Sequence, residues 1–261
     1  MKVNKDSHTF TILFTFFCTI VLVFPLTLVY VGTKPIADKY WLDQHVVKTL
    51  ASMGLLDDSN PKSIDIAKAR EDYTKLEKYT VGTPGKDSAG RDIVVYPKSY
   101  DFAGIAADSS KLVLLPVKDE IISKALQDNS YTGNYPVFFY VTEVNGQKRF
   151  GGDFTGPGLW GNVALAVGSN ADGSQLTGLR VLFNQETPGL GGRIAETWFT
   201  GQFKDKKPGS GMVFNKAGNS VDNGFDAIAG ATISSTAVKD TVNNKALILL
   251  KALIAQKGGT L

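Results

Sequence analysis

The sequence predicts an α+β protein, in which a single N-terminal transmembrane helix precedes a domain with an antiparallel β-sheet. Three observations carry this prediction: an uncharged run from Thr9 to Val31, two β-hairpin patterns within residues 136–184, and an apolar C-terminal run from Ser234 to Gln256. Strands and helices alternate too irregularly for a βαβ array, which favours an antiparallel sheet. With 43% hydrophobic and 20% charged residues, the chain can bury a substantial core.

The uncharged run has the length of a membrane span. As a helix it would extend about 34 Å, enough to cross the hydrocarbon core of a bilayer, and Pro25 is tolerated in such a helix. The run is longer than the apolar part of a signal peptide and no Ala-x-Ala site follows it, so we expect a retained anchor. Lys2 and Lys5 outweigh Asp6 in the tail, which places the N-terminus in the cytoplasm and the main domain outside it.

We divide the chain into a cytoplasmic tail (1–8), the transmembrane helix (9–31), a helical and mixed segment (32–130) and a C-terminal domain (131–261). In the third segment, helices are expected from Trp41 to Leu55, with Gly54 as a stop, and from Pro61 to Tyr79. Ile93–Tyr96 and Leu112–Leu115 are expected to be short strands. The residues expected to face inward are Leu42, Val46, Leu50 and Met53 in the first helix and Ile64, Ala67 and Leu76 in the second.

The C-terminal domain carries the strand signals. Asn145-Gly146 is the strongest short hairpin signal, and it joins the apolar residues 136–144 to Gln147–Phe150. A second pair of strands is expected at Asn162–Val167 and Leu176–Phe183. The remaining predicted elements are a glycine-rich loop, a helix from Arg193 to Phe203, and a final helix from about Ser234 to Gln256 that ends before Gly258-Gly259.

Several classes of function are disfavoured by composition. Cys18 is the only cysteine, which excludes an intramolecular disulfide and any cysteine-based metal or iron–sulfur site. His8 and His45 lie far from every glycine-rich motif, so we expect them in the tail or at an interface and expect neither a catalytic nor a metal site. The net charge of +3 is spread along the chain without a basic, aromatic-interleaved run, so nucleic acid is not an expected partner.

The stretch from Asp226 to Thr232 places one threonine behind a Gly-Ala pair at the start of the predicted final helix. Free amide N–H groups at a helix start favour a phosphate, and a threonine hydroxyl there could carry a phosphate ester. Threonine before an apolar run is also a common N-cap residue. Local chemistry leaves both interpretations of Thr232 open.

Two glycine-rich segments could contact a ligand. Gly156–Gly161 matches the dinucleotide pattern G-x-G-x-x-G by letter, but it precedes a strand and contains proline, so we reject that interpretation. Its Leu159 and Trp160 could instead wall an apolar slot. In the second segment, Pro188-Gly189 suits a type II turn, and Leu190 between glycines suits a backbone that approaches a flat ring closely.

Together these motifs resemble the flavin-bearing subunits of two related ion-motive respiratory complexes, which share an FMN-binding domain. One is the C subunit of the sodium-translocating NADH:quinone reductase, and the other is the G subunit of the Rnf complex. Their flavinylation motif, D-x-x-[S/T]-G-A-T, is similar to Asp226–Thr232, with Ala229 departing at the Ser/Thr position and putting the efficiency of modification in doubt. The family also carries the E-T-P-G-L-G loop, here Glu186–Gly191, and Gly158–Trp160 matches a G-L-W segment that favours the NADH:quinone reductase branch.

The resemblance implies a covalent cofactor. A flavin transferase would join FMN through its phosphate to Thr232, recognising Asp226, Gly230 and Ala231. Arg193 could offset the phosphate charge. The residues expected to contact the flavin are Leu159, Trp160, Glu186, Thr187, Gly189, Leu190, Gly191, Gly230, Ala231 and Ile233.

The resemblance also implies a role and a location. Residues 131–261 would be the FMN-binding domain, facing the periplasm from a bacterial inner membrane, and would pass electrons within a complex that oxidises NADH, reduces quinone and moves sodium. Partner subunits would hold the NADH site, the iron–sulfur centres and the ion path. Two alternatives remain: the G subunit of an Rnf-type complex, and a membrane-tethered, non-redox binding or assembly module in which Thr232 is only a helix cap.

Overall fold

The computed structural model describes residues 8–88, 90, 92–127, 136–215 and 220–258. Contacts divide the chain into two units, Met1–Leu42 and Asp43–Leu261, each of which is described by itself. The predicted cytoplasmic tail, apart from His8, and the predicted boundary at residues 130/131 lie outside the described residues.

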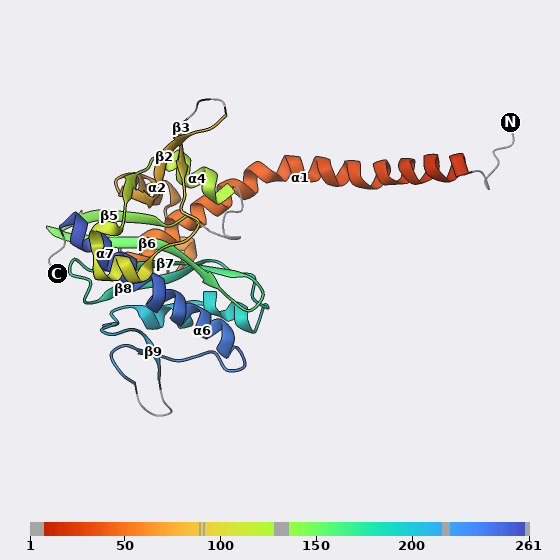
Figure 1. The fold of residues 1–261 in the computed structure, drawn as a ribbon. Helices are drawn as coiled ribbons and strands as arrows, with labels where there is room; N and C mark the ends of the chain where they lie inside the picture. Colours follow the sequence, from red (N-terminus) through yellow and green to blue (C-terminus); the bar gives the residue numbers. More distant parts are fainter. Residues whose placement is uncertain (1–7, 89, 91, 128–135, 216–219, 259–261) are drawn as a thin grey trace. The chain divides into compact units, whose positions relative to one another are not determined.

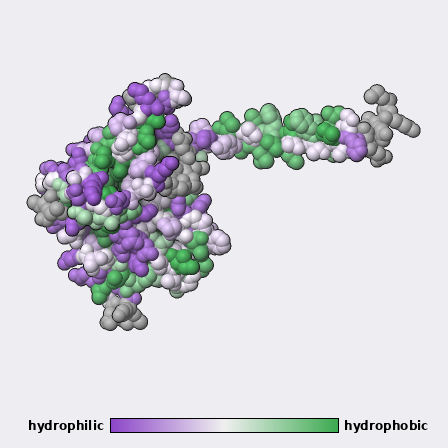
Figure 2. All heavy atoms as spheres, viewed as in Figure 1, coloured by the Kyte–Doolittle hydropathy of each residue, from purple (hydrophilic) through white to green (hydrophobic). Residues whose placement is uncertain are grey.

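The first unit contains most of a single long helix, α1 (His8–Ser52), which includes both the predicted span and most of the predicted helix at Trp41–Leu55. It is long and apolar enough to cross a membrane, and hydrophobic side chains cover much of the part belonging to this unit (Figure 2). The hydroxyls of Thr19, Thr27 and Thr33 donate to carbonyls four residues earlier at 2.8–2.9 Å. These bonds satisfy the polar groups of an otherwise apolar surface, as a lipid environment requires.

The second unit is built on one antiparallel six-stranded sheet, which confirms the predicted α+β class (Figure 1). The strand order is β4 (Leu114–Pro116), β1 (Glu77–Val81), β5 (Phe138–Val144), β6 (Gln147–Pro157), β7 (Asn162–Ser169) and β8 (Leu176–Phe183). Strands from both sides of residue 130 therefore share the sheet. Asn145 and Gly146 have φ of 53° and 75°, as a type I′ hairpin turn requires.

Alternating residues of β5 contribute to two cores, one on each face of the sheet. In β5, Phe139 and Val141 join a core beneath α6 (Thr232–Thr241) and α7 (Leu247–Lys257), which are linked by a π-helical turn. Phe138 and Tyr140 join the opposite core with the end of α1, α2 (Ile66–Thr74) and α4 (Asp119–Gln127). This two-residue alternation is the expected geometry of a strand buried on both faces.

The end of α1 lies against a row of glycines that crosses three strands. Gly151, Gly168 and Gly178 are direct neighbours in β6, β7 and β8. A Cβ at Gly168 would overlap the carbonyl oxygen of Ser52, and one at Gly151 would lie 2.7 Å from Cγ of Met53. The missing side chains therefore form the surface on which this helix ends.

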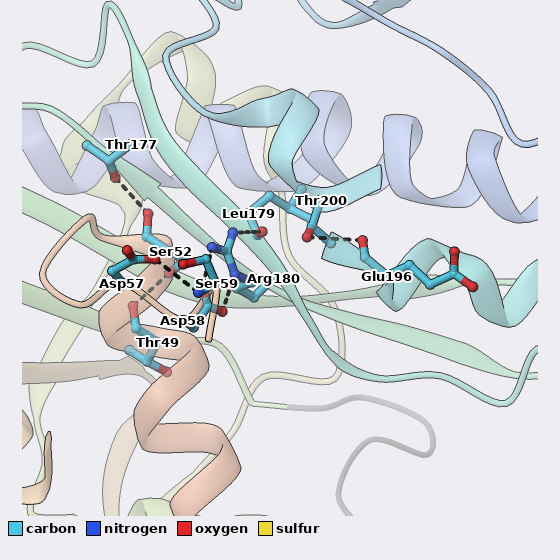
Figure 3. A network of polar contacts seen from close by, with 10 residues as sticks. All are labelled: Thr49, Ser52, Asp57, Asp58, Ser59, Thr177, Leu179, Arg180, Glu196 and Thr200. Carbon is cyan, nitrogen blue, oxygen red and sulfur yellow. Dashed lines mark hydrogen bonds and ion pairs between the residues drawn. The ribbon is translucent and has the colours of Figure 1, made fainter. Parts of the chain in front are cut away.

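Polar contacts fix the segment that follows α1 to β8 (Figure 3). The Thr177 hydroxyl donates to the Ser52 carbonyl at 2.7 Å. Arg180 forms an ion pair with Asp58, with Nε at 2.6 Å from Oδ2. The last residue of α1 and the segment that follows it are therefore both held to β8. Gly54, with φ of +69°, terminates the helix as predicted.

The prediction that His45 lies in a tail or at an interface is wrong. His45 is buried, with 3% of its surface exposed. Its Nε2 lies 2.8 Å from Oδ2 of Asp153, and the Tyr140 hydroxyl donates to the same oxygen at 2.8 Å. These residues come from α1, β5 and β6. They form a polar cluster inside the core that joins the helix to the sheet.

Two predicted helices are wrong in extent. The helix predicted at Pro61–Tyr79 is limited to α2, capped by Asp65, because residues 77–80 pair with β5 instead. Ala67 is exposed, whereas Ala69 and Tyr73 are buried. The helix predicted at Arg193–Phe203 is broken into short turns by the extended backbone of Glu196.

The predicted strands at Ile93–Tyr96 and Leu112–Leu115 correspond to β3 (Asp92–Val95) and β4, each shifted by one or two residues. Elements that the sequence analysis did not predict as such are short. They are η1 (Pro61–Ser63), β2 (Thr83–Lys86), α3 (Phe102–Ala107), η2 (Ser109–Lys111), η3 (Gly191–Ala195), α5 (Thr197–Thr200), η4 (Gly201–Phe203), β9 (Val213–Phe214), β10 (Gly224–Phe225) and the π-helical turn (Val242–Ala246).

Candidate functional site

Thr232 is the first residue of α6 and is exposed. The N-cap position belongs to Ala231, which makes no side-chain capping bond, so the interpretation of Thr232 as the cap is wrong. The amides of the first helical turn have no partner inside the helix and carry the positive end of its dipole. The Thr232 hydroxyl thus stands in solvent at a position where a phosphate is favoured.

Two buried serines hold the helix start while Thr232 and Ile233 remain outside. The Ser235 hydroxyl accepts from the Ile228 amide at 3.0 Å and donates to the Ala231 carbonyl at 3.1 Å. Gly230, with φ of +78°, provides the left-handed residue of the turn. No local sequence pattern identifies Ser235 as a holding residue, because the amide that donates to its hydroxyl lies seven residues earlier.

Asp226, at the other end of the motif, is exposed and its backbone is fixed by Gln202. The Asp226 amide donates to Oε1 of Gln202 at 2.7 Å, and Gln202 Nε2 donates back to the Asp226 carbonyl at 3.3 Å. The carboxylate accepts from Nδ2 of Asn215 at 2.8 Å. This part of the motif therefore presents an ordered acidic group at the surface.

Glu186 joins the three sequence motifs. It is buried, with 5% of its surface exposed, at the start of the loop that follows β8. Oε1 accepts from the amides of Leu159 and Trp160 at 2.8 and 3.2 Å. Oε2 accepts from the hydroxyl of Ser234, in the first turn of α6. Segments that are 26 to 48 residues apart in sequence thus meet at one carboxylate.

The loop from Thr187 to Gly192 has the predicted turn. The Leu190 amide donates to the Thr187 carbonyl at 3.1 Å, and Gly189 has φ of +74°, as a type II turn with glycine at its third position requires. A Cβ on Gly230 would lie 3.7 Å from Cδ1 of Leu190. Leu190 therefore lies beside the turn that precedes Thr232.

Large apolar side chains on all three motifs are exposed around this point. The exposed fractions are 49% for Leu159, 69% for Trp160, 48% for Leu190 and 58% for Ile233. Of the other predicted contact residues, Thr187, Gly189 and Gly230 are exposed, whereas Gly191 and Ala231 are buried with Glu186. A hydroxyl at a helix start beside exposed apolar side chains fits a ligand with a phosphate and a flat, largely apolar ring.

Arg193 and Trp198 flank the loop. The Arg193 guanidinium lies 5.2 Å from the centroid of the Trp198 ring, and its Nε is 3.4 Å from a Glu196 carboxylate oxygen. The sequence predicts that Arg193 offsets a phosphate charge. In the structure its guanidinium instead contacts the Glu196 carboxylate and the Trp198 ring. Trp198, exposed and aromatic, was not singled out from the sequence.

Comparison with known families gives a match over this region. Residues 158–246 match the model of the FMN-binding domain. The matched range begins at the Gly158–Trp160 segment, includes the Glu186–Gly192 loop and the Asp226–Thr232 motif, and ends in the π-helical turn.

The proteins similar in sequence to this chain include subunits of two kinds of ion-translocating complex. The G subunit of an ion-translocating oxidoreductase complex from Methanosarcina acetivorans is 35% identical over 134 residues, covering 48% of this chain and 69% of that protein. The C subunit of the Na⁺-translocating NADH-quinone reductase from Neisseria meningitidis is 24% identical over 245 residues, covering 91% and 89%. A crystal structure of the corresponding reductase component from Parabacteroides distasonis has the same fold, with a TM-score of 0.51, 22% identity, and coverage of 82% of this chain and 94% of that chain.

Proposed function

The chain belongs to the FMN-binding domain family, and on that premise we propose that it is the flavin-carrying subunit of a membrane-anchored, ion-translocating oxidoreductase complex. The observation that carries the proposal is the exposed Thr232 on the first turn of α6, next to the exposed Ile233 and close to the loop that carries the exposed Leu190. FMN, when bound, supplies the redox chemistry. The residues of this chain tether it, flank its ring and exclude water from one side.

We propose that the tether is a phosphoester to Thr232. The bond between Thr232 Oγ1 and the flavin phosphorus would replace the P–O bond of an activated flavin phosphoanhydride donor. The other phosphate of that donor would leave with the bridging oxygen, and the hydroxyl proton would pass to a base of the transferase. The first-turn amides and the helix dipole favour the anionic phosphate that remains. Asp226, Gly230 and Ala231 would be recognised by the transferase, while Ala229, which replaces the usual Ser/Thr, is not the residue that would carry the flavin.

The more specific proposal is the C subunit of a sodium-translocating NADH:quinone reductase. It is supported by similarity that extends over 91% of the chain to a protein of that type, and by the Gly-Leu-Trp segment at Gly158–Trp160. The alternative, the G subunit of an Rnf-type complex, is supported by the higher identity of 35% over a shorter stretch. Purifying the native complex and identifying its companion chains distinguishes the two.

In this proposal α1 anchors the chain in the cytoplasmic membrane, with its N-terminus in the cytoplasm and the domain on the other side. The sites for NADH and quinone and the ion path would belong to partner subunits. From Thr9 to Val31 the chain contains no Asp, Glu, Lys, Arg or His. A single apolar helix of this kind offers no ion path by itself.

The attachment site can be tested on a denaturing gel viewed under ultraviolet light. The chain is expressed with a flavin transferase, and the wild-type band is expected to fluoresce. Thr232→Ala should abolish the fluorescence, whereas Thr236→Ala, one turn later in the same helix, should retain it. A fluorescent Thr232→Ala band would overturn the attachment site. A dark wild-type band would favour the non-redox binding or assembly module.

A further inference from the structure

We infer that Glu186 is a positioning residue of this site: its carboxylate holds the Leu159–Trp160 turn against the first turn of α6 and makes no contact with the flavin. This replaces the expectation that Glu186 contacts FMN. The inference rests on the proposed function in so far as the positioned ligand is a flavin. The hydrogen bonds of Glu186 are formed within the protein and do not depend on that ligand.

Protein donors occupy both oxygens of this carboxylate. Two backbone amides donate to Oε1, and the Ser234 hydroxyl donates to Oε2. An ionised carboxylate is an acceptor only, which matches three partners that all donate. Since only 5% of Glu186 is exposed, little of the side chain remains available to a ligand.

Two glycines make room for the carboxylate. A Cβ on Gly158 would lie 2.5 Å from Oε1, and a Cβ on Gly191 would lie 2.8 Å from Oε2 and would overlap the Ser234 hydroxyl. Any side chain at either position would displace Glu186. Gly191 is therefore explained by the carboxylate rather than by the approach of a flat ring, which was the interpretation from the sequence.

The arrangement relates the tether to the apolar wall. Ser234 lies two residues after Thr232 on the same helical turn. Trp160, whose amide donates to Glu186, has the most exposed side chain among the four apolar residues of the site. The Leu159–Trp160 turn is closed by the Gly158 amide, which donates to the Gly161 carbonyl at 2.7 Å. A shift of the carboxylate would therefore move the wall relative to the tether.

The positioning bonds can be tested without flavin, by amide hydrogen exchange of the full-length chain in detergent. Glu186→Ala should increase exchange of the Leu159 and Trp160 amides about tenfold, because each loses its acceptor. Glu71→Ala is the control and should leave both amides unchanged, because Glu71 is an exposed residue of α2, which packs on the opposite face of the sheet. Unchanged exchange in Glu186→Ala would overturn the inference.

The second arm uses the chain expressed with its transferase and measures the flavin absorbance spectrum. Ser234→Ala removes one of the three bonds without changing charge or the loop sequence, so it serves if Glu186→Ala does not fold. Both variants should retain covalent flavin but shift its absorbance maxima, whereas Glu71→Ala should leave the maxima unchanged. Faster exchange with an unshifted spectrum would show that Glu186 orders the loop without positioning the flavin, which also overturns the inference.

A shifted spectrum in Glu186→Ala with unchanged amide exchange would indicate direct contact between Glu186 and the flavin. Failure of the proposed function is separate from these outcomes. It would appear as a wild-type chain without flavin, while the exchange experiment would still report on the carboxylate.

Discussion

Two buried carboxylates, Asp153 in the sheet and Glu186 beside the candidate site, are connected in opposite ways. Oδ2 of Asp153 receives both contacts, from His45 and Tyr140, and Oδ1 has no hydrogen-bond partner among the described residues. Glu186 uses both oxygens and bonds two backbone amides as well as a hydroxyl. One acid joins side chains of the core, and the other joins loops.

The different hydrogen-bond partners of Asp153 and Glu186 predict different effects of their removal, one on the stability of the domain and the other on the geometry of the candidate site. The partners of Asp153 lie on a helix and a strand that the core already packs, so its removal leaves buried polar groups without compensation. The partners of Glu186 are two backbone amides of a turn and a hydroxyl at a helix start. We therefore expect Asp153 variants to lose mainly stability and Glu186 variants to lose mainly the geometry of the site.

The largest expected effect is that of Asp153→Ala. Removing one member of a buried polar pair should lower the free energy of unfolding by about 3–5 kcal/mol. Urea unfolding of the full-length chain in detergent, followed by circular dichroism, measures this loss. The flavin spectrum of the folded fraction should be unchanged.

Asp240→Ala is the control for this prediction. Asp240 is exposed and lies 3.6 Å from the Lys239 ammonium, so its loss should cost less than about 1 kcal/mol. If Asp153→Ala cost no more than Asp240→Ala, the distinction between the two buried acids would fail.

A smaller effect is expected from Gly191→Ala. Its Cβ would displace both Glu186 and Ser234, and such overpacking should lower the free energy of unfolding by about 1–3 kcal/mol. Because the displaced groups belong to the site, the flavin absorbance should shift as well.

Gly201→Ala is the matched comparison, since no atom lies within 4 Å of its added Cβ and its φ is −62°. This substitution should be neutral or stabilising by up to about 1 kcal/mol. A Gly191→Ala variant with wild-type stability and spectrum would contradict the tight fit around Glu186.

The smallest effect concerns a third acidic group, the partly buried phenol of Tyr100. Burial raises the pKa of Tyr100 to about 12 from its ordinary value of 10.0. The unfolded chain therefore loses this proton first, and stability falls as the pH rises from about 10 towards 12. At pH 11 the loss amounts to about 1.4 kcal/mol.

Tyr100→Phe should lack this contribution. The stability difference between wild type and Tyr100→Phe, measured by urea unfolding, should therefore change by about 1.4 kcal/mol between pH 9 and pH 11. A difference that is independent of pH would contradict the assignment.

Local signals predicted the features that depend on neighbours in the sequence. The Asn145-Gly146 hairpin and the Pro188-Gly189 turn follow from backbone preferences, and both are present. The helix at Pro61–Tyr79 was predicted too long because its last residues pair with β5, more than 50 residues away, and this pairing overrides helical spacing.

The sequence by itself determined the long apolar N-terminal helix, the antiparallel class and the three motifs of the candidate site, because hydrophobic periodicity and turn residues are local properties of a sequence. Only the tertiary structure decided how these motifs combine. Thr232 begins α6 without capping it, His45 is buried against a residue 108 positions away, and Glu186 joins its loop to Ser234 across 48 residues. Such pairings depend on how distant segments pack, so no local pattern specifies them.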